Sequence, residues 1–220
     1  MSTKPLLPMP ENWEPTRATL HAYASAVGTI PRAHAAPRDK WWHISLKVRP
    51  EGLITDAMAL PAGGSFTVRM DLRSHEVVVA ASTGERSTLS MQDGSTATEF
   101  GERLIALVGE LGLDADYATD KFADDTERSY DPAAATAYFE ALSNINHNLS
   151  LHRDSLDGPT GPLQVWPHGF DLAFEWFGTR METSEEDGQT IEMPAQLNLG
   201  FYPGGRAYFY SNPWPFEAAL

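Results

Sequence analysis

The sequence predicts an α+β fold in which a mainly antiparallel sheet carries helices packed on one side. Apolar residues recur at helical spacing in three segments, and the segments with strand-like alternation come as hairpins. The chain has 220 residues, 42% of them hydrophobic, which is enough for one domain with a substantial core. We therefore expect a single domain over residues 1–220.

The first helix is expected to begin near Pro15 or Thr16, because proline suits the first turn of a helix. Pro31 should end or kink this helix, since it has no N–H for the helical hydrogen-bond pattern. A strand with one buried face is predicted to follow over residues 42–48, where apolar side chains alternate. The buried face of the helix consists of apolar residues at three- and four-residue steps: Leu20, Tyr23, Val27 and Ile30.

The middle of the chain predicts a hairpin and a second helix. Two apolar runs, residues 66–70 and 77–79, flank a polar turn and indicate the hairpin. Thr96 and Glu99 have the spacing of a capping box, in which each side chain bonds the backbone N–H of the other residue. We therefore expect a helix that begins after Thr96 and ends near Gly112.

A third helix should begin at Asp131, whose side chain can cap the first turn, and continue to about Asp154. Residues 163–177 then read as a strand that is interrupted around Pro167 and Gly169. The interruption predicts an irregular backbone at that point.

A last hairpin is expected from residues 197–201 and 206–210. It aligns with the earlier hairpin without gaps when residues 195–211 are set against residues 66–82. Both halves of the chain also share the order helix, Trp/His segment, polar connection and hairpin. We therefore predict an internal duplication, with pseudo-repeats over residues 15–95 and 131–220.

Charge and composition exclude several classes of protein. With 16 basic and 30 acidic residues the formal net charge is −14, which repels a nucleic-acid backbone. The absence of cysteine excludes disulfides, thiolate metal sites and a cysteine nucleophile. No apolar run is long enough to span a membrane, and the N-terminus lacks the apolar segment of a signal peptide. We expect an acidic cytoplasmic protein, and its oligomeric state stays open.

One histidine and one aspartate stand between aromatic residues in the last third of the chain. Trp166, His168 and Asp171 lie close together in the sequence, and Trp42 and His43 form a shorter copy of the pattern. Aromatic rings supply the apolar area of a small-molecule pocket, and polar groups orient the ligand. We interpret His168 as the acid/base or hydrogen-bonding group and Asp171 as its orienting partner. Trp42, His43 and Trp166 are expected to line the same pocket, between the two halves of the chain.

Other interpretations stay open for each histidine. His168 can be hydrogen-bonded in a strand bulge, with Asp171 capping a turn. His43 can face solvent at a strand end. His21, a further ligand-binding candidate beside the apolar stripe of the first helix, can be satisfied by a backbone or water contact. A metal site of His21, His43 and His168 has no support from their spacing, and no phosphate or dinucleotide fingerprint is present, so we expect neither metal nor cofactor.

An ordered set of short motifs runs through nearly the whole chain: residues 19–21 (Thr-Leu-His), 41–43 (Trp-Trp-His), 129–132 (Ser-Tyr-Asp-Pro), 166–172 (from Trp-Pro-His to Phe-Asp-Leu) and 201–204 (Phe-Tyr-Pro-Gly). In this order the motifs resemble an uncharacterised bacterial family that is known only as a domain of unknown function. The resemblance implies a single cytosolic, bacterial family domain. It brings no catalytic residue or cofactor with it.

Two functions from different classes follow. The first is small-molecule binding through the aromatic and histidine pocket, which leaves open a cofactor-independent enzyme. The alternative is a protein-interaction or assembly module without catalytic activity, in which Trp214 and Phe216 form the contact surface. Burial separates the two: an open aromatic pocket favours the first, and solid packing there with an exposed tail favours the second.

Overall fold

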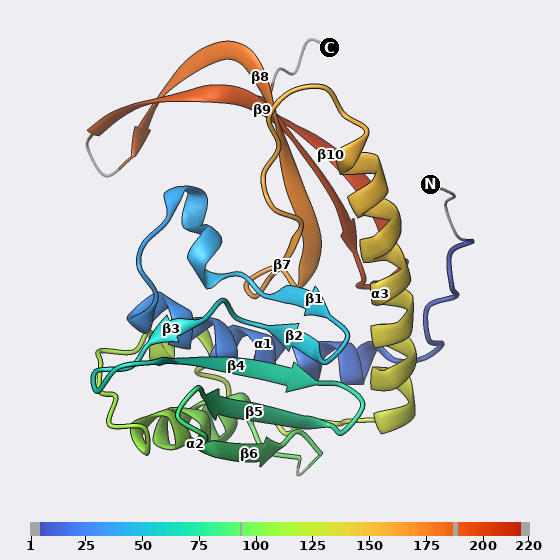
Figure 1. Cartoon of the computed structure of the whole chain (residues 1–220). Coiled ribbons are helices and arrows are strands. Elements are labelled where there is room, and N and C mark those ends of the chain that lie inside the picture. Colours follow the sequence, from blue (N-terminus) through green and yellow to red (C-terminus); the bar gives the residue numbers. More distant parts are fainter. Residues whose placement is uncertain (1–4, 93, 187–188, 217–220) are drawn as a thin grey trace.

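The computed structural model describes residues 5–92, 94–186 and 189–216. Its helices are α1 (Glu14–His34), α2 (Ala97–Gly109) and α3 (Pro132–Asp154), with two short 3-10 helices, η1 (Asp39–Ile44) and η2 (Thr119–Lys121). The strands form two antiparallel sheets (Figure 1). The predicted α+β class with mainly antiparallel sheet is therefore confirmed.

The first sheet has the strand order β1-β2-β4-β5-β6, and β3 also pairs with β4. Its strands are β1 (Lys47–Arg49), β2 (Gly52–Ile54), β3 (Met58–Ala59), β4 (Ser65–Asp71), β5 (Glu76–Ala81) and β6 (Arg86–Ser90). Buried and half-buried residues alternate along β4, so one face of the sheet belongs to the core. Figure 1 shows α1 and α2 behind this sheet.

The second sheet has the order β10-β9-β8-β7. Its strands are β7 (Gln164–Trp166), β8 (Asp171–Glu186), β9 (Gln189–Tyr202) and β10 (Tyr208–Trp214). Strands β8 and β9 form a long hairpin that extends well beyond β7 (Figure 1). Leu46 and Val165 join the two sheets, because each backbone N–H donates to the other's carbonyl, at 2.9 and 2.8 Å. Helix α3 runs along the side of both sheets (Figure 1).

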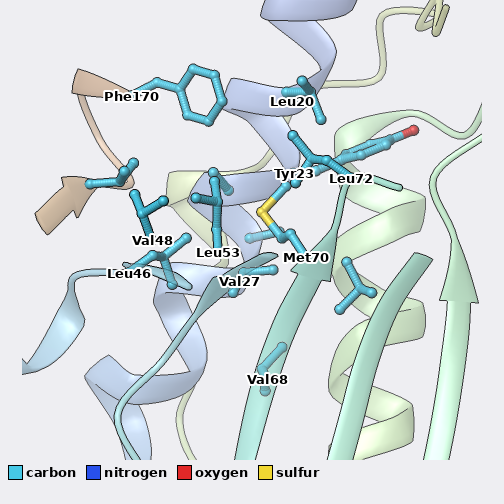
Figure 2. Close-up of a cluster of buried hydrophobic side chains, with 14 of the residues drawn as sticks. Leu20, Tyr23, Val27, Leu46, Val48, Leu53, Val68, Met70, Leu72 and Phe170 are labelled. Atoms are coloured by element: carbon cyan, nitrogen blue, oxygen red, sulfur yellow. The ribbon is translucent and has the colours of Figure 1, made fainter. Parts of the chain in front are cut away.

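One apolar core connects the two sheets. Phe170 follows β7 and is fully buried, and Figure 2 shows it beside side chains of α1 and the first sheet. Its ring centroid lies 5.6 Å from that of Tyr138 on α3, which stacks on Trp13 at 4.6 Å. Tyr23 stacks on Phe100 at 3.8 Å and so connects α1 to α2. These contacts make the sheets parts of one packed body.

The predicted starts of α2 and α3 and the predicted end of α3 match the structure, whereas α1 begins and α2 ends slightly before the predicted positions. The capping box of Thr96 and Glu99 is present at the start of α2. Asp131 caps α3, which ends at Asp154 as predicted. Of the two alternatives predicted for Pro31, an end to the first helix is wrong, because α1 continues to His34. The last turn persists because the carbonyl of Pro31 still accepts a bond from the N–H of the residue after His34.

The strand predicted over residues 42–48 is wrong in its first half. Trp42 and Ile44 lie in the 3-10 helix η1, and the strand begins only at Lys47. Lys40 and Trp41 have left-handed backbone angles, with φ of 54° and 60°, which turn the chain before it becomes extended. Alternation of apolar residues does not reveal such a turn.

The gapless alignment of the two hairpins is also wrong. It sets Phe66 against Ala195 and Ala81 against Tyr210. Phe66 pairs with Ala81 in the first sheet. Tyr210, however, pairs with Gly200 and not with Ala195. The pseudo-repeats over residues 15–95 and 131–220 therefore stay a prediction without the support of that alignment.

Candidate functional site

A cavity of about 470 Å³ lies against one face of the second sheet. Side chains of β7, β8, β9 and β10 form one wall, and side chains of α1 and η1 form the other. The residues that carry its polar and aromatic character are Arg32, Lys40, Trp41, Trp166, His168, Asp171, Glu175, Gln196, Asn198, Tyr210 and Asn212. The cavity therefore combines two cations, two carboxylates, several amides and two indole rings.

The strand register explains why so many polar groups meet on this face. Successive side chains of a strand point to opposite faces, so Asp171 and Glu175 of β8 share one face. Glu175 pairs with Asn198 of β9, which pairs with Asn212 of β10. The sheet itself therefore places a row of three polar side chains along the cavity, and Tyr210 lies on the same face of β10.

Asp171 and Tyr210 form a hydrogen-bonded pair on this wall. The Tyr210 hydroxyl donates to Oδ2 of Asp171. The Tyr210 side chain crosses Gly200, where a Cβ atom would lie only 2.5 Å from the phenol oxygen, so a residue without a side chain is required there. Burial, together with the negative charge of Asp171, raises the pKa of Tyr210. The phenol therefore stays protonated and remains a donor.

Glu175 is a buried carboxyl group on the same wall, and its residue is only 7% exposed. Its Oε1 accepts a 3.2 Å hydrogen bond from the indole N–H of Trp42. Its Oε2 is buried and has no hydrogen-bond partner in the described structure. Burial raises the pKa of Glu175, while the bond from Trp42 and the charge of Lys40 oppose this shift. A carboxyl group with a raised pKa keeps its proton to a higher pH than an exposed one and can serve as an acid or a base.

The opposite wall carries two cations. The Lys40 ammonium donates to Oε1 of Gln196 at 2.8 Å, and the amide of Gln196 donates to Asn198 at 3.2 Å. The Arg32 guanidinium lies over the Trp41 ring, 4.6 Å from its centroid. Both cations are thus held in position by groups that also line the cavity.

Three of the predicted site residues, Trp166, His168 and Asp171, line this one cavity. The turn after β7 separates them, and the N–H of Phe170 donates to the carbonyl of Trp166 at 2.7 Å. The His168 ring is exposed and meets Trp166 edge-on, with ring centroids 5.8 Å apart. Within the described residues, Asp171 takes its side-chain hydrogen bond from Tyr210, and no hydrogen bond joins it to His168.

The other predicted residues lie outside the cavity lining. Trp42 is absent from the lining, and its indole N–H donates to Glu175, which is part of it. His43 is 5% exposed, and its Nδ1 accepts from the backbone N–H of Arg38 at 3.2 Å. His21 contacts the carbonyl of His168 through Nε2 at 3.0 Å and stacks on Phe170.

The fold does not gather a metal site from the three histidines His21, His43 and His168. Among the residues that the structure describes, no group of three or more histidine, aspartate or glutamate side chains is placed to hold a metal ion. Burial lowers the pKa of His43 and of His21, so each ring tends to remain neutral.

The cavity residues that sequence reasoning missed include Arg32, Lys40, Glu175 and Tyr210. A signal for Glu175 was present, because it stands four positions after Asp171 in a strand and so shares its face. Arg32 and Lys40 had no such signal. Their positions depend on the end of α1 and on the left-handed turn before Trp42.

In the described part of the chain, no helix has both the length and the apolar character needed to cross a membrane.

The comparisons with known proteins give a family and no function. Neither the curated proteins nor the solved structures include a match to the chain. A family model described as a family of unknown function (DUF5996) matches residues 5–220. The chain therefore belongs to the DUF5996 family, as the ordered motifs indicated.

Proposed function

We propose that the protein binds a small polar molecule in the cavity on the second sheet. The observation that carries this proposal is the convergence of Asp171, Glu175 and Tyr210 with tryptophan side chains around one open cavity of about 470 Å³. A volume of this size suits a small ligand, and a few fixed polar groups among aromatic walls are typical of ligand sites. The net charge of −14 favours a small molecule over nucleic acid as the ligand.

The polar groups are pre-organised for binding. Tyr210 fixes the Asp171 carboxylate, and Trp42 fixes one oxygen of Glu175. Groups that are already in position lose little conformational entropy when a ligand arrives. The raised pKa of Glu175 also gives the site a group that can exchange a proton with a bound ligand. A cofactor-independent reaction is therefore compatible with the site, and binding is the function that we propose.

The proposal is tested by a thermal-shift screen of purified protein against amino acids, hydroxy acids, sugars and nucleosides. We expect at least one class to raise the melting temperature of the wild type. Tyr210→Phe removes the donor to Asp171 and should weaken that effect. Tyr208→Phe is the matched control, because Tyr208 lies on the same strand, is 53% exposed and is not part of the cavity lining. An equal response of both variants would contradict the proposal.

The rival function is an interaction module. Its support is the exposure of Phe216, at 78%, and of Phe209, at 47%, near the C-terminal strand. Trp214 is half-buried and so offers less free surface than expected. Light scattering after gel filtration separates the two accounts. Self-association that Phe216→Ser abolishes, together with no ligand in the screen, would favour the interaction module.

A further inference from the structure

The wall of the cavity that faces the sheet is built around cations. Arg32 comes from the last turn of α1, and Lys40 comes from η1. Among the described residues no carboxylate is within ion-pair distance of Arg32, although Asp120 interacts with it electrostatically, and its guanidinium lies over the ring of Trp41. A guanidinium that stacks on a ring keeps its N–H groups free at its edge, where a planar anion can accept two of them.

The backbone that carries Lys40 and Trp41 is strained. Both residues are left-handed, with φ of 54° and 60°, although neither is glycine. Such a conformation is less favourable than ordinary backbone for any residue that carries a Cβ atom. Two consecutive residues of this kind bring the ammonium of Lys40 to Gln196 and the ring of Trp41 beneath Arg32. Strain of this kind concentrates at functional sites, and here it coincides with the cavity wall.

The two walls differ in charge. Arg32 and Lys40 lie on one side, and Asp171 and Glu175 lie on the sheet. An anionic group of a ligand would be attracted to the first wall, and hydroxyl or amino groups would donate to the carboxylates of the second. Arg32 is exposed and forms no ion pair among the described residues, so an anion can reach its guanidinium without breaking one.

We propose that Arg32 and Lys40 form an anion subsite. The ligand of this cavity is then a small polar molecule with one carboxylate or phosphate group and with hydroxyl or amino groups at its other end. This inference rests on the proposed binding function and names its ligand class. Carboxylate and phosphate share the chemistry that the two cations recognise, and the experiment distinguishes them.

Three probes with the same carbon skeleton test the subsite: glycerol, glycerate and glycerol 3-phosphate. Calorimetric titration at constant ionic strength gives the affinity of each for the wild-type protein. We expect at least one of the two anionic probes to bind about tenfold more tightly than glycerol, the gain typical of one charge-assisted contact. A preference for glycerate identifies a carboxylate ligand, and a preference for glycerol 3-phosphate identifies a phosphate ligand.

Arg32→Gln and Lys40→Gln should each reduce the affinity for the preferred anionic probe about tenfold and leave glycerol unchanged. Arg206→Gln is the matched control, since Arg206 is exposed and lies outside the cavity lining. Circular dichroism of each variant checks that it is folded.

The anion subsite is overturned if neither anionic probe binds more tightly than glycerol. It is equally overturned if Arg206→Gln has the same effect as Arg32→Gln. In either case the proposed binding function survives if neutral molecules bind to the protein and Tyr210→Phe lowers the affinity for them. The proposed binding function fails on its own if Tyr210→Phe leaves the affinity for every bound molecule unchanged.

Discussion

In both sheets, successive residues of a strand alternate between the apolar core and the opposite, more polar face. The two sheets differ in what covers this polar face. In β4, Val68 lies in the core and Arg69, on the other face, is half-buried. In β8, Phe174 lies in the core, and Glu175, on the other face, is itself buried against the cavity wall. The difference arises from η1, which lies over the polar face of the second sheet. A polar face becomes a candidate site only when another element encloses it.

The largest expected effect concerns the apolar side that both sheets share. Phe170→Ala removes a fully buried ring that packs on Tyr138, and we expect it to lower the free energy of unfolding by about 3–5 kcal/mol. Because one core joins the sheets, both should unfold in a single, earlier transition during urea denaturation. Phe216→Ala, at a residue 78% exposed, is the control and should change stability by less than about 0.5 kcal/mol. Separate transitions for the two sheets would disprove the shared core.

On the polar face the expected effect on stability is smaller. Tyr210→Phe removes the hydroxyl that donates to Asp171, and we expect a loss of about 1.5 kcal/mol from a hydrogen bond to a charged group. Tyr208→Phe should be nearly neutral, because Tyr208 is exposed. Thermal unfolding of both variants measures the difference. Equal stability of the two variants would mean that the hydrogen bond between Tyr210 and Asp171 does not stabilise the fold.

The left-handed backbone at Lys40 predicts which of two substitutions at this position is the more stable. At φ of 54°, Lys40→Gly should be more stable than Lys40→Ala by about 1 kcal/mol, because glycine adopts this conformation without a steric cost. An ordinary helical position behaves in the opposite way, and Ala106→Gly in α2 should lose about 1 kcal/mol. Chemical denaturation of the three variants compares them. Greater stability of the alanine variant at position 40 would show that the strain is absent.

Glu175 should make stability depend on pH. Burial raises its pKa in the folded state, so the folded protein binds this proton more tightly than the unfolded chain does. The stability that results is present at low pH and is lost as the pH rises through the folded-state pKa. Glu175→Gln cannot titrate, so its free energy of unfolding relative to wild type should increase as the pH rises from about 4, the ordinary pKa of a glutamate, through the higher folded-state pKa.

Glu192→Gln is the control for this pH dependence, since Glu192 is exposed. A difference from the wild type that does not rise with pH for Glu175→Gln would contradict the raised pKa of Glu175. A rise as steep for Glu192→Gln as for Glu175→Gln would show that burial of Glu175 is not the cause.

Local signals in the sequence predicted the local structure well. The cap at Asp131 and the capping box at Thr96 are properties of neighbouring residues, and both are present. Trp166, His168 and Asp171 are close in sequence, and the turn between β7 and β8 leaves all three beside one cavity.

The rest of the site depends on contacts between distant residues. Lys40 reaches Gln196, and Trp42 reaches Glu175, across separations of more than one hundred residues. No periodicity encodes these contacts. The aromatic residue Trp42 was expected to line the pocket because of its type, but its place is set by the 3-10 turn of η1. The cations were missed for the same reason.

An NMR titration of isotope-labelled protein with the molecule that binds best in the screens locates the binding surface directly. We expect backbone amide shifts at Asp171, Asn198, Tyr210 and Lys40, which surround the cavity, while β4 and β5 of the first sheet remain unchanged. Shifts confined to the first sheet, or to the segment around Trp214 and Phe216, would contradict this expectation and place the binding surface elsewhere.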